Sequence, residues 1–208
     1  MWKILAGAAV VILTASQAHA TLQITTGIFG GNQGTENVLY NQAGLQNDSF
    51  LVQGVTNQTG TIVDFVSTTA LHTNGGQATI TALGGGTFTN VDISLDNPIL
   101  GFSKLIFNID ADANGFAHIT TTDQFGTVFD FGNLALDGTG QNFFTIYSLD
   151  AQKAILTHID TSVGIAAISD LEQVRIGAVE RDPTHVPEPT TLALLGAGLL
   201  GFGAVRRR

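Results

Sequence analysis

The chain has 208 residues, no cysteine and a formal net charge of −9, and all but one of its 17 acidic residues lie between Thr21 and Asp182. So acidic a surface repels phosphate backbones, which excludes nucleic-acid binding, and the lack of cysteine excludes thiol catalysis and thiolate-bound zinc. A hydrophobic content of 44% nevertheless indicates a folded chain rather than a disordered one.

The first twenty residues have the pattern of an export signal. Lys3 supplies a positive charge ahead of an apolar run from Ile4 to Leu13, and Ala18-His19-Ala20 has the small residues of a signal-peptidase site. Cleavage after Ala20 would make Thr21 the first residue of the mature protein. The alternative is an uncleaved membrane anchor, for which the run is short.

Residues 21–182 are predicted to form one all-β domain. Apolar and polar residues alternate with a period of two, which indicates strands with one buried face, in the windows 77–82, 90–95, 104–109, 155–159 and 174–178. Weaker strand patterns occupy 22–29, 50–55, 61–67, 127–131 and 143–149.

Turn sequences separate these windows at short intervals, for example Asn74-Gly75-Gly76 and Gly84-Gly85-Gly86. The pattern predicts an antiparallel two-sheet sandwich or jelly roll of about ten or eleven strands. Only Gly164 to Gln173 has a pattern compatible with a short helix. No internal repeat of solenoid or propeller length is present.

Asp110, Asp112 and Asn114, followed by Gly115, resemble the first half of a calcium-binding EF-hand loop. The twelfth position holds Thr121 instead of glutamate, so a complete EF-hand is not expected, and calcium is at most a weakly held ion. The alternative is a β-hairpin with the three-residue loop 113–115. Its register would place Ile109 opposite Ile119 and Asp110 opposite His118.

The sequence contains no recognisable catalytic motif, which favours a protein that is not an enzyme. A secreted hydrolase stays open, since two facing carboxylates suffice for glycoside hydrolysis. His72, His118 and His158 lack the close spacing of a zinc site and are predicted to be exposed strand residues.

Most aromatic residues between 125 and 147 are expected in the core. If a sugar-stacking surface exists, Tyr147 and whichever of Phe143 and Phe144 faces outward are the candidates. A carbohydrate-binding module, with or without the assistance of calcium, is therefore an alternative function.

The chain ends with three features in a fixed order. Val186-Pro187-Glu188-Pro189 forms an extended, accessible peptide, because proline cannot pair as a strand. An apolar segment, 192–205, is suited to enter a bilayer as a helix, and Arg206, Arg207 and Arg208 would remain on the cytoplasmic side. The predicted organisation is thus a signal peptide (1–20), a β-sandwich (21–182), a linker (183–191) and a hydrophobic helix with a basic end (192–208). A permanent C-terminal anchor is the alternative for the last part.

This C-terminal order resembles the PEP-CTERM signal of Gram-negative bacteria. The resemblance implies recognition by an exosortase, a membrane enzyme that cuts near Pro187-Glu188-Pro189 and releases or transfers the protein to the cell surface. Stretches between Val55 and Gly177, such as Gln173-Val-Arg-Ile-Gly177, loosely resemble the sandwich-like domain of many such proteins. The expected function is a structural or adhesive role in the extracellular polysaccharide or biofilm layer. The expected partners are signal peptidase, an exosortase and, as a ligand, extracellular polysaccharide.

Overall fold

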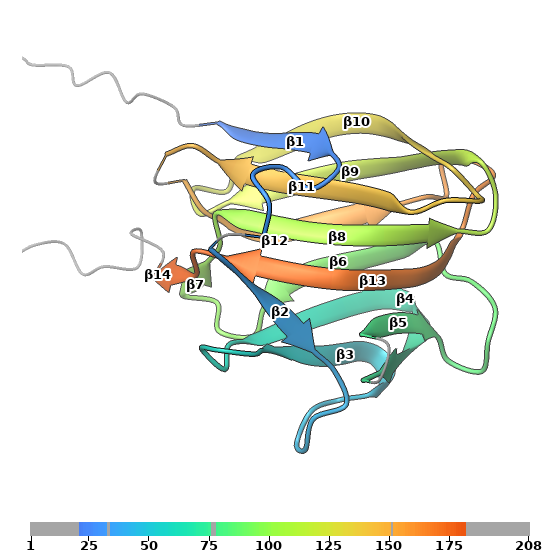
Figure 1. The fold of residues 1–208 in the computed structure, drawn as a ribbon, viewed down its shortest axis with the longest axis horizontal. Helices are drawn as coiled ribbons and strands as arrows, with labels where there is room; N and C mark the ends of the chain where they lie inside the picture. The colour runs from blue at the N-terminus through green and yellow to red at the C-terminus, as the bar shows by residue number, and fades with distance from the viewer. Residues whose placement is uncertain (1–20, 33, 76–77, 151, 182–208) are drawn as a thin grey trace, which may run out of the picture.

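The computed structural model describes residues 21–181, except 33, 76–77 and 151, and every regular element among them is a β-strand (Figure 1). The strands are β1 (Leu22–Thr26), β2 (Thr35–Leu39), β3 (Asp48–Thr56), β4 (Ile62–Asn74), β5 (Thr79–Ala82), β6 (Asn90–Leu95), β7 (Leu100–Gly101), β8 (Lys104–Ala111), β9 (Gly115–Asp123), β10 (Val128–Leu136), β11 (Asn142–Ser148), β12 (Ala154–Asp160), β13 (Ile168–Gly177) and β14 (Glu180–Arg181). The predicted all-β class is confirmed. The predicted signal peptide and C-terminal helix lie outside the described residues, within which no helix is long and apolar enough to cross a bilayer.

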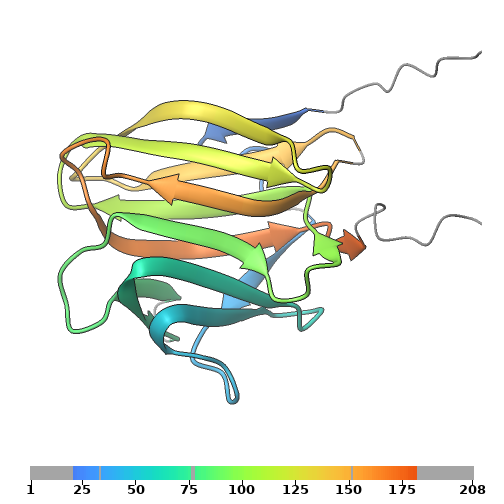
Figure 2. The same cartoon turned by 180° about the vertical axis from the view of Figure 1, so that it is seen from behind.

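The strands form two layers that face each other. Hydrogen bonding runs in the order β1-β11-β8-β13-β2-β3-β4-β6-β12-β9-β10, and every pairing is antiparallel. Strands β1, β11, β8, β13 and β2 make the layer nearer the viewer in Figure 1, and β10, β9, β12, β6, β4 and β3 make the layer seen from behind in Figure 2. The fold is therefore the predicted antiparallel sandwich, continuous along one side.

The core lies between the layers, where alternate residues of each strand point inward. β8 contributes Leu105, Phe107 and Ile109, and the opposite layer contributes Ile93 and Ile119, all fully buried. Such burial is the main favourable term for a domain without disulfides. The alternation predicted for β6 and β8 is confirmed at these positions, but Ile106 and Asn108 on the other face of β8 are buried as well.

β13 corrects the predicted helix at 164–173. Its inward residues are Ile168, Leu171, Val174 and Ile176, and the register shifts at two places along its pairing with β8. Gln173 has a φ of 50° at the second shift, a conformation typical of a bulge. Because each bulge adds one residue, apolar residues recur every third position, which imitates a helical period. Beyond the bulge β13 pairs with β2, and before it with β5, which also pairs with β4 and so joins the two layers.

The predicted hairpin at 109–119 is wrong. β8 pairs with β11 and β13, whereas β9 pairs with β10 and β12 in the other layer. Ile109 therefore lies opposite Asn142 and Leu171, and Asp110 lies opposite Asp170 rather than His118. Residues 112–114 cross between the layers instead of turning within one. Alternation identified both strands correctly, but the same apolar pattern suits either arrangement, because both bury the same faces.

The chain from β1 to β2 crosses the outside of the front layer (Figure 1). Phe29 stacks on Tyr147 with ring centroids 4.4 Å apart, and its backbone N–H donates to Thr145 Oγ1 at 3.1 Å. Farther along, Lys104 Nζ donates to the Gly31 carbonyl at 2.9 Å. This crossing covers one half of the outer face of β11 and β8, which explains why Ile106 and Thr145 are buried there. The other half of that face carries the candidate site.

Candidate functional site

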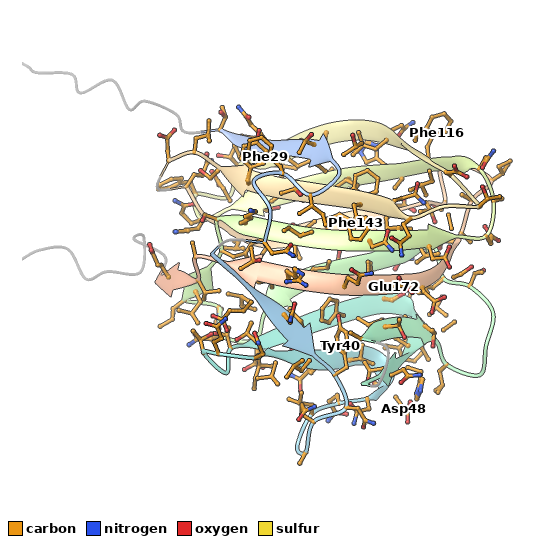
Figure 3. The ribbon with its side chains drawn as sticks, viewed as in Figure 1. Phe29, Tyr40, Asp48, Phe116, Phe143 and Glu172 are labelled. Atoms are coloured by element: carbon orange, nitrogen blue, oxygen red, sulfur yellow. The ribbon has the colours of Figure 1, made fainter. Side chains whose placement is uncertain are left out.

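The uncovered half of the front layer presents a polar and aromatic surface, which we call the β8–β13 outer face. Its residues point away from the core, because each has at least one strand neighbour in the core cluster. It consists of Phe143 on β11, Asn108 and Asp110 on β8, and Asp170 and Glu172 on β13. Figure 3 shows Phe143 and Glu172 on the side facing the viewer.

One row of this surface runs directly across the strands. Phe143 is the register partner of Asn108, Asn108 of Glu172, and Glu172 of Thr79 on β5. Asn108 Nδ2 donates to Glu172 Oε2 at 3.1 Å, which holds the carboxylate in place. The side chains of Asn108 and Thr79 are buried, yet Asn108 Oδ1 and Thr79 Oγ1 have no hydrogen-bond partner. Buried polar atoms are rarely left unpaired, so this row is a place where a further polar partner is expected.

The next row brings two carboxylates together. Asp110 lies opposite Asp170, which in turn lies opposite Thr81 on β5 and, beyond it, His72 on β4. Burial, and then the negative charge of Asp110, raise the pKa of Asp170 above its usual range. The two carboxylates face each other on one sheet, and like charges directly opposite each other are destabilising.

The sequence-predicted residues Asp112 and Asn114 serve a different purpose. Asp112 Oδ1 accepts from the Ala167 backbone N–H at 2.7 Å, and Asn114 Oδ1 accepts from the Gly138 N–H at 2.8 Å. These bonds tie the 112–114 crossing to the β12–β13 and β10–β11 loops. Asp110 lies apart from them on the sheet face.

Metal ligation is not evident from the arrangement of side chains. Among residues 21–181, apart from the four omitted positions, no group of three or more histidine, aspartate or glutamate side chains is placed to hold an ion. Calcium binding by Asp110, Asp112 and Asn114 stays a prediction.

Each of the three histidines contacts a different aspartate, and His118 and His158 both lie near Asp160. His72 Nδ1 lies 2.5 Å from Asp48 Oδ1 and His158 Nδ1 lies 2.5 Å from Asp92 Oδ1. His118 Nε2 lies 3.2 Å from Asp130 Oδ1, and its Nδ1 contacts Asn133 Oδ1. All three are on the outer faces of strands, as the sequence predicted.

A groove lies at the end of the sandwich where Figure 3 labels Phe116. This open groove has a volume of about 680 Å³ and is lined by Phe116, Val163 and Ile165, with Asn114 and Asn142 at its polar side. Both amides are already engaged, since Asn142 Nδ2 donates to the carbonyls of Ile109 and Asp137 at 2.9 Å. The groove is thus mainly apolar and has few free polar groups.

Of the two aromatic candidates from the sequence, the structure leaves one open. Phe144 is buried in the core and Phe143 is the outward residue of the pair. Tyr147 is also outward, but Phe29 covers its ring and its hydroxyl donates to Gln23 Oε1 at 2.9 Å. Asn108, Asp170 and Glu172 were not predicted, because strand pairing alone brings them beside Phe143. The alternation of Asn108 and Asp110 on β8 was the available signal.

The comparisons with known proteins concern two different parts of the chain. Residues 185–208 match the PEP-CTERM protein-sorting motif. The chain carries a PEP-CTERM sorting signal. The match contains Pro187, Glu188, Pro189 and the three terminal arginines, and it supports the sequence prediction of an exosortase substrate. The protein is therefore exported and sorted to the cell surface.

The β-domain resembles solved structures of family 29 carbohydrate-binding modules at a low level. One has 9% identity and a TM-score of 0.32, covering 74% of this chain and 98% of that one. A second, solved with mannohexaose, has 9% identity and a TM-score of 0.31, covering 70% and 88%. A third has 10% identity and a TM-score of 0.31, covering 81% and 99%. No curated protein matches the chain. These likenesses concern the all-β architecture alone.

Proposed function

We propose that this PEP-CTERM protein has a structural or adhesive role in the extracellular polysaccharide layer and that it binds polysaccharide through the β8–β13 outer face. The sorting motif supports the location, because it directs the protein to the surface where such polymers lie. The role of the outer face rests on the residues of this chain.

The observation that carries the proposal is the row Phe143, Asn108 and Glu172. A flat ring stacks on the C–H face of a pyranose, and adjacent carboxylate and amide groups accept hydrogen bonds from its hydroxyls. Glu172 Oε1 has no hydrogen bond among the described residues, and it is the group that a sugar on the surface would reach, since the unpaired Asn108 Oδ1 and Thr79 Oγ1 beside it are buried. An aromatic ring next to polar groups with free hydrogen-bonding capacity is the arrangement that sugar binding requires.

The groove beside Phe116 is the less suitable surface. Phe116 is 48% exposed, but the amides nearest to it are used to hold loops together. A sugar placed there would stack on the ring without free polar partners. The two phenylalanines therefore provide a matched pair of variants.

The test is retention of the purified protein by exopolysaccharide isolated from the producing cells. We expect Phe143→Ala to weaken binding by about tenfold, the loss of roughly one stacking contact, and Phe116→Ala to leave it unchanged. Equal binding by wild type and Phe143→Ala would contradict the proposal, and loss only in Phe116→Ala would assign binding to the groove. Release of new reducing ends from the polymer would indicate hydrolysis instead of binding alone.

A further inference from the structure

The acidic pair on the β8–β13 outer face has no compensating group. Asp110 and Asp170 face each other across β8 and β13, and within the described residues neither carboxylate has a hydrogen bond or an ion pair. Natural sheets usually place opposite charges or neutral residues at such positions, because facing like charges are destabilising. The pair therefore needs an explanation from outside the folded chain.

The other acidic residues do not share this property. In the part of the chain that the structure describes, every other aspartate or glutamate that is at least partly buried accepts a hydrogen bond or contacts a histidine; these residues are Glu36, Asp64, Asp92, Asp123, Asp160 and Glu172. The unpartnered Asp96 and Asp150 are exposed in turns, where water solvates them. Asp110 and Asp170 alone combine partial burial with the lack of a partner in these residues.

No cation of the described chain is placed to neutralise the pair. Arg175 lies on the same face of β13 opposite Ile106, two outward positions from Asp110 on β8. It makes no ion pair among the described residues. His72 contacts Asp48, and Lys104 donates to the Gly31 carbonyl. The negative charge of the face thus remains available to a ligand.

The neighbouring row supplies a further acceptor, because Glu172 Oε1 has no hydrogen bond among the described residues and the atoms beside it are unpaired acceptors as well. Asn108 is 0% exposed and its Oδ1 is an unpaired acceptor, while its Nδ2 is engaged by Glu172. Thr79, 4% exposed and opposite Glu172, has an unpaired hydroxyl oxygen. Ionised carboxylates and an amide oxygen only accept hydrogen bonds. The complementary group is a cation with several N–H donors.

Resting on the polysaccharide-binding function proposed above, we infer that this face selects glycans that carry protonated amino groups, that is, polymers of hexosamine with free amines. An ammonium group has three N–H donors, no acceptor and a positive charge. Asp110 lies one outward position, about 7 Å, along β8 from the register partner of Phe143, so a polymer with one ring on Phe143 places a neighbouring ring over the pair of Asp110 and Asp170. A divalent metal is disfavoured, since it takes six or more oxygens and no group of three suitable side chains is present in the described residues.

The experiment compares two oligosaccharides of equal length, one of glucosamine and one of N-acetylglucosamine, at a pH where the amines and carboxylates are ionised. We expect the wild-type protein to bind the glucosamine oligomer at least about tenfold more tightly. Asp110→Asn and Asp170→Asn should each remove most of that preference. Asp150→Asn, which makes the same change in net charge at an exposed turn, is the control and should keep it.

Each other outcome overturns the inference in a recognisable way. Equal affinity for both oligomers, with both weakened by Phe143→Ala, would leave polysaccharide binding intact and remove the amine preference. A preference that survives Asp170→Asn, or one that Asp150→Asn also loses, would mean general attraction to an acidic protein. Binding of neither oligomer would overturn the inference, and the exopolysaccharide retention assay then decides the proposed function separately.

Discussion

At the scale of single residues, Asp170 is where binding and stability are expected to oppose each other. Burial, followed by the Asp110 charge, raises the pKa of Asp170 in the folded protein, so the folded state holds this proton more tightly than the unfolded chain does. Stability is consequently lost as the pH rises from the unfolded-state pKa through the higher folded-state value. We expect Asp170→Asn to raise the melting temperature at neutral pH and to have little effect below the ordinary pKa of aspartate. Thermal denaturation at a series of pH values measures this, and a lower melting temperature at neutral pH would refute it.

The Asp170→Asn variant also separates a loss of amine binding from a loss of folding. Since Asp170→Asn is expected to fold at least as stably as the wild type, loss of amine preference in it cannot be assigned to unfolding. Phe143 and Asp110 were identifiable in the sequence as an aromatic candidate and an acidic candidate. That they share one surface was not, because Phe143 and Asp110 lie on strands far apart in the sequence and only the hydrogen-bond register of β8 and β11 joins them.

Calcium is a second question at the scale of residues. Asp112 and Asn114 each use a side-chain oxygen to hold a backbone N–H, which leaves fewer free ligands than calcium usually takes. If calcium binds there, it should raise the melting temperature, and chelation by EDTA should reverse the increase. An unchanged melting temperature would remove the site.

At the scale of elements, β2 and β3 share the shortest pairing between neighbouring strands along the main sheet. Only Val38 with Thr56 and Leu39 with Val55 are paired there, and Gly54 lets the strands approach. A Cβ at Gly54 would overlap Val38 Cγ1 and lie 2.9 Å from Tyr40 Cε1. We expect Gly54→Ala to lower the free energy of unfolding by about 1–3 kcal/mol through overpacking. Denaturant unfolding measures it, with Gly140→Ala as the control, since a Cβ there meets no atom closer than 3.5 Å. Equal free energies of unfolding for Gly54→Ala and the wild type would contradict the close packing of β2 against β3 at Gly54.

Strands were predictable where one face alternates regularly, and their partners were not. β6 and β8 followed the apolar pattern, whereas β13 imitated a helix because its two bulges shift the period. β9 was expected to turn back on β8, but it belongs to the other layer. Pairing depends on long-range contacts that local periodicity does not encode. The outer face, which is built from β11, β8, β13 and β5, is therefore a product of topology.

At the scale of the whole molecule, the sorting signal is one continuous segment of the sequence, whereas the candidate binding surface is assembled from several strands. The sorting motif is a continuous stretch of 24 residues, 185–208, and could be recognised from order and composition. In cells that lack exosortase, we expect the protein to remain with the membrane fraction and to keep its C-terminal segment, including Arg206 to Arg208. Fractionation and mass measurement of the product test this. Normal surface display without the enzyme would contradict exosortase-dependent sorting.

We propose that the exported domain is held in the polysaccharide layer by the β8–β13 outer face. The most direct measurement is the fraction of surface-sorted protein that stays with the matrix, rather than the medium, when cells produce the wild type, Phe143→Ala or Phe116→Ala. We expect Phe143→Ala to shift the protein to the medium and Phe116→Ala to leave it in the matrix. Equal retention of all three proteins would contradict it.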